Sequence, residues 1–90
     1  MHTLKSLQEM ALEMATIRGF SKDSLKDKCL VLMEEVGEIA RAILRGRGDP
    51  RKEIVDVLVV CLLIAYLLGM DGDELEKEFI EKVENDKLRV

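Results

Sequence analysis

Hydrophobic residues recur every three or four positions along most of the chain, the spacing that places them on one face of a helix. The first such segment ends near Gly19, and its apolar positions are Leu4, Leu7, Met10, Ala11, Met14 and Ile17. The second extends from about Asp23 to Leu44, with apolar positions Leu25, Cys29, Leu32, Val36, Ile39 and Ile43. We therefore predict two amphipathic helices over these ranges.

A third helix is indicated by its boundary signals. Asp49 precedes Pro50, as an N-cap residue precedes proline at the first helical position, and Gly69 follows Leu68 as a C-terminal stop. Residues 57–68, VLVVCLLIAYLL, carry no charge, but the run is shorter than the roughly 20 residues of a membrane span. We expect a core helix, hydrophobic on all sides and including Tyr66, which packs both inside the subunit and against a second copy.

The fourth helix begins with capping-box spacing from Asp71 to Glu74, and Leu75, Phe79 and Val83 give it one apolar stripe. The sequence contains no strand signal, no repeat and no low-complexity linker. We therefore predict an all-α fold, a bundle of four helices that forms a single domain over residues 1–90.

Chain length and composition limit what this bundle can be. A chain of 90 residues buries only about 60 to 65% of its unfolded surface, which leaves a monomer marginally stable. Together with the apolar third helix, this predicts a homodimer or a dimer of dimers, with the site near the subunit interface. The hydrophobic content of 48% and the charged content of 36% are typical of a globular protein.

Charge and cysteine content narrow the class of protein further. A net charge of -4 argues against a nucleic-acid partner, because no basic stripe is present to replace phosphate counterions. Cys29 and Cys61 lie in apolar surroundings, which favours buried, reduced thiols over a disulfide between them. Charged residues interrupt the N-terminal segment, so no signal peptide is expected. We expect a cytoplasmic protein without a membrane partner.

Carboxylates occur in pairs within two of the predicted helices. Glu35 and Glu38 lie one turn apart, and Glu53 and Asp56 repeat this spacing at the head of the third helix. If the two pairs face each other, four like charges converge, and a cation is needed between them. Oxygen ligands from carboxylates suit a hard ion such as Mg²⁺, for which Mn²⁺ is expected to substitute.

Other metal chemistries lack their ligands. The only histidine is His2, at the terminus, so neither a di-iron Glu-x-x-His site nor a zinc site can be built. A simpler interpretation of the acidic residues is a solvated helix face on a noncatalytic oligomerisation module. The second acidic pair makes this less favoured than a metal site.

The stretch Glu34-Glu35-Val36-Gly37-Glu38, followed by Glu53-Ile54-Val55-Asp56, resembles the signature of the MazG-like nucleotide pyrophosphohydrolases, an all-α superfamily. The resemblance covers about residues 23–85. It implies a Mg²⁺-dependent enzyme that cleaves nucleoside triphosphates between the α and β phosphates, giving a monophosphate and pyrophosphate in nucleotide-pool house-cleaning.

The resemblance also implies roles for individual residues. Glu35, Glu38, Glu53 and Asp56 would bind the metal, and Glu34, with Glu35 and Glu38, would belong to the catalytic group, Glu34 as a helper in activating water. Lys82, Asn85 and Arg89 resemble the family's substrate-binding residues, although their spacing departs from the usual pattern. Phosphoribosyl-ATP pyrophosphohydrolase is an alternative within the same superfamily, but its Lys-Val-Gly-Glu-Glu-like stretch is missing.

Two further expectations concern the packing at this site. We expect Asp56, which is flanked by Val55 and Val57, to be largely buried, and one of the coupled carboxyl groups to have a raised pKa. We also expect Gly37 to allow close helix packing near the site.

Overall fold

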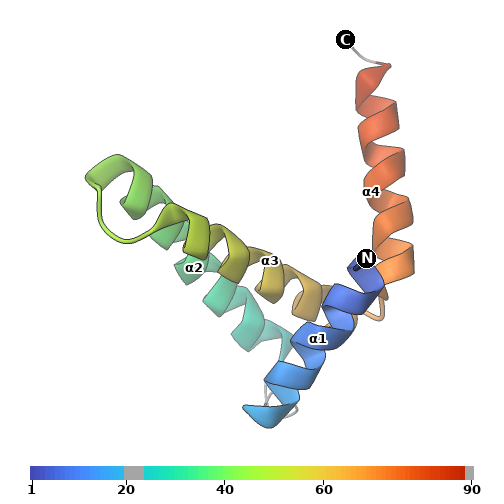
Figure 1. Ribbon diagram of the computed structural model, residues 1–90, viewed down its shortest axis with the longest axis horizontal. Coiled ribbons are helices and arrows are strands. Elements are labelled where there is room, and N and C mark those ends of the chain that lie inside the picture. Colours follow the sequence, from blue (N-terminus) through green and yellow to red (C-terminus); the bar gives the residue numbers. More distant parts are fainter. Residues whose placement is uncertain (20–23, 89–90) are drawn as a thin grey trace.

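The computed structural model describes residues 1–19 and 24–88, and in these ranges all regular structure is helical. The four helices are α1 (Leu4–Ile17), α2 (Leu25–Arg45), α3 (Pro50–Leu67) and α4 (Gly72–Lys87) (Figure 1). This confirms the prediction of an all-α fold with four helices. The predicted start of the second helix at Asp23 lies outside the described residues.

Side-chain caps fix where α1 and α2 begin. Thr3 and Ser24 each accept a hydrogen bond from a backbone N–H three residues ahead, and each backbone N–H at the cap is bonded in return by the side chain of Ser6 or Asp27. These reciprocal bonds satisfy N–H groups that the first helical turn leaves without partners.

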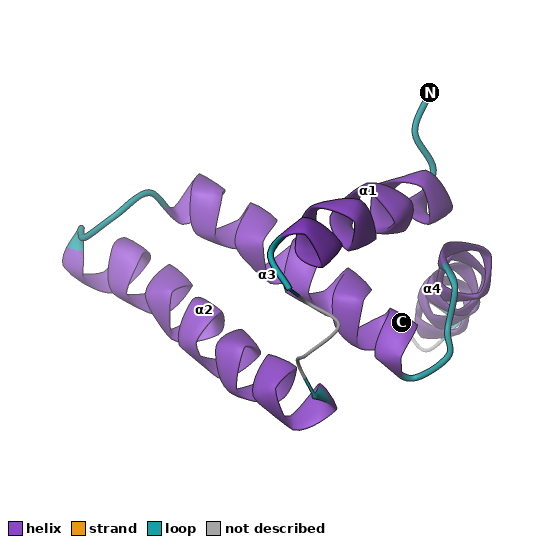
Figure 2. Ribbon diagram, turned by 90° about the horizontal axis from the view of Figure 1, so that it is seen from below, coloured by secondary structure: helices purple, strands orange, loops and turns teal. Residues whose placement is uncertain are grey.

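The connection from α2 to α3 is short and has two clear signals. Gly46 has φ of 63°, the left-handed conformation that ends a helix and that glycine adopts without a steric cost. Asp49 accepts a hydrogen bond from the Arg51 N–H at 3.0 Å and caps α3, with Pro50 in its first turn as predicted. The two helices therefore run antiparallel, side by side (Figures 1 and 2).

Asp71 caps the start of helix α4 and accepts a hydrogen bond from the Glu74 N–H at 2.9 Å. Helices α3 and α4 meet at 111°, and α4 extends away from the α2–α3 pair (Figure 1). Its first turn packs against the start of α1, where Lys5 and Asp73 form an ion pair at 3.7 Å. The four helices of one chain thus form an open bundle.

Helix α1 is fixed across α3 by a small core and by one buried amide. Ala11 and Ala15 of α1 pack against Leu63 of α3. The side-chain N–H₂ group of Gln8, which is 3% exposed, donates hydrogen bonds to the carbonyl oxygens of Leu62 at 3.1 Å and Met70 at 3.0 Å. Because both acceptors lie near the end of α3, Gln8 fixes that end against α1.

Several residues predicted to be buried lie at the surface. Tyr66 is 51% exposed, and Cys29 and Cys61 are exposed free thiols. One chain covers α3 only in part, because α4 turns away from it, and the packing of a second copy against the uncovered part stays a prediction. No single helix in the described ranges is long and apolar enough to cross a membrane. Helices α3 and α4 taken together have the required length and composition, but the chain bends by 111° between them.

Candidate metal centre

Three carboxylates from two helices converge on one point. Glu35 of α2 and Glu53 and Asp56 of α3 each offer an oxygen atom, and these atoms all lie within 4.8 Å of one another. The antiparallel pairing of α2 and α3 brings Glu35 opposite the first turns of α3. Glu53 and Asp56 share one side of α3 because they are separated by three positions.

The electrostatic effect of this convergence is largest at Glu35. Its pKa is raised above the ordinary value of 4.5, first by the loss of surrounding water and then by the negative charges of Asp56 and Glu53. A hydrogen bond with Glu53 and the charge of Glu38 act in the same direction. Glu35 and Glu53 are partly buried, so repulsion between these groups is only partly screened. Among the coupled carboxyl groups, Glu35 is therefore the one with the raised pKa that the sequence led us to expect.

Asp56 is exposed, and the expectation that it is largely buried is wrong. Asp56 lines a hollow of about 430 Å³, and its neighbour Val55 lines the same hollow and is exposed as well. Flanking residues in a helix point about 100° apart, so apolar neighbours in sequence do not imply burial.

The other two glutamates of α2 lie beside this group of three. Glu38 is about half exposed, and its carboxylate faces Arg41 of the same helix at 3.5 Å. Glu34 is exposed and adjacent to Glu35 in sequence. The structure thus brings together Glu35, Glu53 and Asp56. Glu38 lies near enough for its negative charge to help raise the pKa of Glu35.

Two of the three predicted substrate residues, Lys82 and Asn85, lie on α4, which extends away from the α2–α3 pair that carries the acidic group (Figure 1). Lys82 is exposed and forms an ion pair with Asp86 of the same helix at 2.9 Å. Asn85 is also exposed, and Arg89 lies outside the described residues. Within one chain, the described part of α4 does not bring these side chains to the carboxylates.

Two basic residues next to the acidic group were not identified from the sequence. Arg51 and Lys52 line the same hollow as Val55 and Asp56. Both lie in the first turn of α3, where the positive end of the helix dipole favours anions. Their signal in the sequence is the four-residue spacing from Lys52 to Asp56, which places a cation and a metal-ligand candidate on one face.

The expectation that Gly37 permits close helix packing is wrong. A Cβ atom at this position would meet only the Arg41 side chain, at 3.8 Å, an ordinary contact. The glycine that does permit close packing is Gly72, where a Cβ atom would overlap the backbone of Lys5. Close approach thus occurs between α4 and α1, at the opposite end of α3 from the carboxylates.

The donor set fits a hard divalent cation. All three converging groups are carboxylates, and such oxygen ligands are those preferred by Mg²⁺, Mn²⁺ and Ca²⁺. A cation between them would remove the repulsion that raises the pKa of Glu35. The exposed side of Asp56 leaves the position open to a ligand from solution.

A comparison with protein families places these residues within one of them. Residues 23–88, more than half of the chain, match the sequence model described as the MazG nucleotide pyrophosphohydrolase domain. Comparison with curated proteins and with solved structures gave no match. The matched range contains both acidic helices and the turn between them. The chain belongs to the family of MazG nucleotide pyrophosphohydrolase domains.

Proposed function

We propose that this protein is a Mg²⁺-dependent nucleoside triphosphate pyrophosphohydrolase that cleaves between the α and β phosphates. The observation that carries the proposal is the convergence of Glu35, Glu53 and Asp56 within 4.8 Å, in a chain of this family. Water adds to the α-phosphorus, the bond from that phosphorus to the oxygen bridging to the β phosphate breaks, and a monophosphate and pyrophosphate leave.

Glu35, Glu53 and Asp56 would hold the metal, with Glu38 able to complete the set after a change of side-chain conformation. Bound Mg²⁺ would supply charge neutralisation for the triphosphate and acidify a water molecule. The protein would contribute to catalysis first by holding these carboxylates in place on two packed helices. Carboxylates on adjacent helical turns need little reorganisation when a ligand binds.

Arg51 and Lys52 are placed to bind the phosphate chain. They border the hollow that reaches Asp56, so phosphates held there lie beside the acidic group. Their positive charges would stabilise the charge that develops on the leaving pyrophosphate. Glu38 and Glu34 are the candidates to accept the proton of the attacking water, and the Arg41 guanidinium orients Glu38.

The deciding experiment measures both products. Purified protein is incubated with common and oxidised nucleoside triphosphates, and monophosphate and pyrophosphate are quantified with Mg²⁺ and with EDTA. We expect equal amounts of the two products, loss of activity in EDTA, restoration by Mn²⁺, and little turnover with Ca²⁺, which prefers longer bonds and more ligands. Preference for oxidised nucleotides would support a role in house-cleaning of the cytoplasmic nucleotide pool.

Three outcomes would contradict the proposal. Release of orthophosphate alone would place the cleavage at another bond, and unchanged hydrolysis in EDTA would exclude the metal mechanism. The absence of turnover on every nucleotide, with the fold intact, would favour the noncatalytic helical module.

A further inference from the structure

Charge is distributed unevenly along the chain. Residues 41–52 contain five of its fourteen cationic residues but only one of its eighteen acidic residues, Asp49. We call the five cations of this stretch the basic tip: Arg41, Arg45, Arg47, Arg51 and Lys52. Since the whole chain has a net charge of -4, the basic tip is a positive region in a protein that is otherwise strongly negative.

The fold gathers these cations at one end of the α2–α3 hairpin. Arg45 is the last residue of α2, Arg47 lies in the turn, and Arg51 is in the first turn of α3. Because the two helices run antiparallel, residues on both sides of the turn lie together at the end of the hairpin on the left of Figure 1.

Most of the positive charge at the basic tip is accessible to a ligand. Arg45, Arg47 and Lys52 are exposed, and none of them forms an ion pair with another residue in the described part of the chain. Arg51 lies 3.7 Å from the Asp49 carboxylate, but its side chain is 92% exposed. An ion pair this exposed is weak, so the guanidinium can turn towards a stronger anion.

The basic tip adjoins the metal centre. Arg51 and Lys52 line the hollow of about 430 Å³ that Asp56 also lines. On α2, Arg45 follows Glu35 by ten positions, which is about 15 Å at the helical rise of about 1.5 Å per residue. This distance exceeds the Debye length of about 8 Å in physiological salt but not that of about 30 Å at about 10 mM. The field of the tip therefore reaches the metal centre most strongly at low ionic strength.

A nucleoside triphosphate meets a charge conflict at this centre. The residues that would hold the metal are carboxylates, and the phosphate chain carries several negative charges of its own. One divalent cation offsets only part of this repulsion. Cations beside the centre attract the phosphates without occupying the position of the metal, and they raise the local concentration of an anionic ligand.

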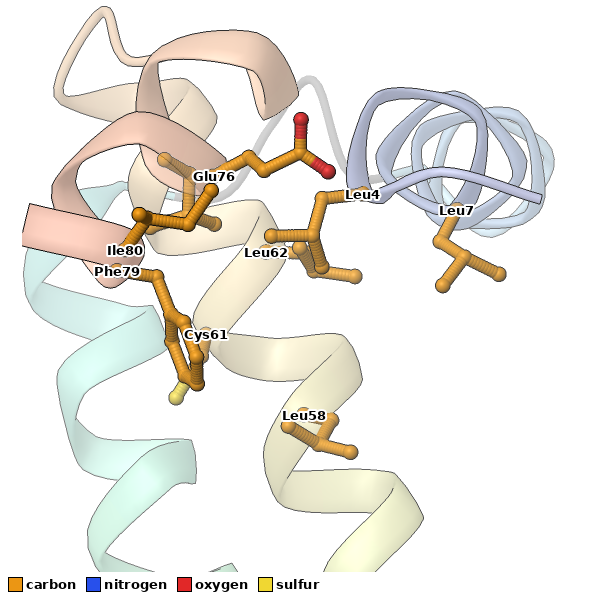
Figure 3. Close-up of a pocket in the computed structure, with 9 residues that line it drawn as sticks. Leu4, Leu7, Leu58, Cys61, Leu62, Glu76, Phe79 and Ile80 are labelled. Atoms are coloured by element: carbon orange, nitrogen blue, oxygen red, sulfur yellow. The ribbon is translucent and has the colours of Figure 1, made fainter. Parts of the chain in front are cut away.

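The hollow between α1, α3 and α4 offers no alternative place for a phosphate chain. It has a volume of about 520 Å³, and its lining includes Leu58, Leu62 and Phe79 (Figure 3). The one charged residue among those that line it is Glu76, a carboxylate. An anion would be repelled there and would lose its water against apolar side chains.

We propose that the basic tip captures the phosphate chain of the substrate, and that Arg45 and Arg47 are specificity-determining residues that favour nucleotides with more phosphate charges. The capture role rests on the proposed function, because the captured anion is the triphosphate substrate. Arg45 and Arg47 attract the substrate equally in the ground state and in the transition state, so they lower KM without changing kcat. Because the attraction grows with the number of charges, triphosphates are bound in preference to diphosphates, and the monophosphate product is released easily.

Kinetics of charge-removing variants test the capture role. In Arg45→Gln/Arg47→Gln, kcat/KM for a nucleoside triphosphate should fall at least about tenfold at low ionic strength, with kcat unchanged. The difference from the parent should nearly disappear at about 1 M salt, where the Debye length is about 3 Å. Arg45→Lys/Arg47→Lys keeps both charges and should retain the kinetics of the parent.

A matched control separates the position of the charge from the net charge. Arg18→Gln/Lys26→Gln removes the same charge from two exposed positions, one at the end of α1 and one in the first turn of α2, away from the basic tip. This control should keep both the kinetics and the salt dependence of the parent. Circular dichroism of each variant reports whether the helices are retained.

A binding measurement is independent of both catalysis and metal. Titration calorimetry in EDTA with inorganic tripolyphosphate, pyrophosphate and orthophosphate should show binding that weakens in this order, because each step removes negative charge. The Arg45→Gln/Arg47→Gln change should weaken tripolyphosphate binding at least about fivefold, whereas Arg18→Gln/Lys26→Gln should leave it unchanged.

Equal effects of the two glutamine double variants would overturn the capture role, because only net charge would then matter. A fall in kcat at constant KM would overturn it as well, since the arginines would then act on the transition state. So would tighter binding of a short single-stranded RNA of equal charge than of tripolyphosphate, which would assign the basic tip to a nucleic acid.

The two readouts distinguish failure of the capture role from failure of the proposed function. A protein that binds tripolyphosphate through Arg45 and Arg47 but hydrolyses no nucleotide contradicts the proposed function alone. An active protein whose kinetics and tripolyphosphate binding are unchanged in Arg45→Gln/Arg47→Gln contradicts the capture role alone.

Discussion

Glu35 on α2 and Asp56 on α3 bring carboxylate oxygens to within 4.8 Å, and the charge of Asp56 is the largest of the neighbouring charges that raise the pKa of Glu35. Two unit charges at this distance repel by about 1 kcal/mol in water and by more where water is excluded. The fold thus holds an unfavourable contact at one site, and that contact becomes favourable when a cation binds.

Replacing Asp56 by asparagine should separate its role in function from its role in stability. Asp56→Asn removes one ligand charge at nearly constant shape, so nucleotide hydrolysis should fall at least about 100-fold. Because Asp56 is exposed and repels Glu35, the metal-free variant should be as stable as the parent, or more stable, at neutral pH. The rise in Tm on adding Mg²⁺ should shrink. Asp73→Asn, at the ion pair with Lys5, is the control and should retain both activity and Mg²⁺ response. An active Asp56→Asn variant would mean that this centre is misassigned.

The pKa of Glu35 predicts how stability depends on pH. Because the pKa of Glu35 is raised above 4.5, the folded metal-free chain binds more protons than the unfolded chain. Glu35 therefore contributes its full stabilisation to the free energy of unfolding below pH 4.5. This stabilisation is lost as the pH rises through the raised pKa. Glu35→Gln removes this titration. The unfolding free energy of the variant minus that of the parent, measured in EDTA, should therefore increase from about pH 4 to about pH 8. A difference for Glu35→Gln that does not change over this pH range would refute the prediction.

Two glycines should respond in opposite directions to the same substitution. In Gly72→Ala the new methyl group overlaps the Lys5 backbone, so α4 has to move away from α1. We expect the free energy of unfolding to fall by about 1 to 3 kcal/mol or more. Gly37→Ala meets only a flexible arginine side chain in a helix interior and should stabilise by about 0.5 to 1 kcal/mol. Urea unfolding of both variants measures the difference; a neutral Gly72→Ala would show that the contact between α1 and α4 yields easily.

Gln8 should be the polar residue of α1 most sensitive to substitution. Gln8→Met keeps the length of the side chain but removes both hydrogen bonds to the end of α3, and we expect a loss of about 1 to 3 kcal/mol in unfolding free energy. Glu9→Met, at the exposed neighbouring position, should change stability by less than about 0.5 kcal/mol. Equal effects of the two changes would contradict the bridging role of Gln8.

The sequence predicted the helices and the convergence of three of the four carboxylates proposed as metal ligands, because both depend largely on local rules. Spacing and caps such as Asp49-Pro50 determine the helix bounds, and three-residue spacing determines which carboxylates share a face. The direction of α4 was not predictable in this way, because it depends on the close approach of Gly72 to Lys5, residues far apart in the chain. The burial of Asp56 and Tyr66 was misjudged for the same reason, since burial depends on which elements cover α3. Arg51 and Lys52 were missed because exposed basic residues are common at helix starts and gain significance only beside the carboxylates.

The short turn from Gly46 to Asp49 also bears on the order of folding. Glu35 and Asp56 meet through one hairpin of neighbouring helices, whereas Gln8 reaches Leu62 across 54 positions of the chain. Closing a short loop costs less entropy than closing a long one, and local contacts form faster. The α2–α3 hairpin can therefore nucleate before α1 and α4 dock, and a divalent cation present at that stage would offset the mutual repulsion of its carboxylates and accelerate the nucleation step.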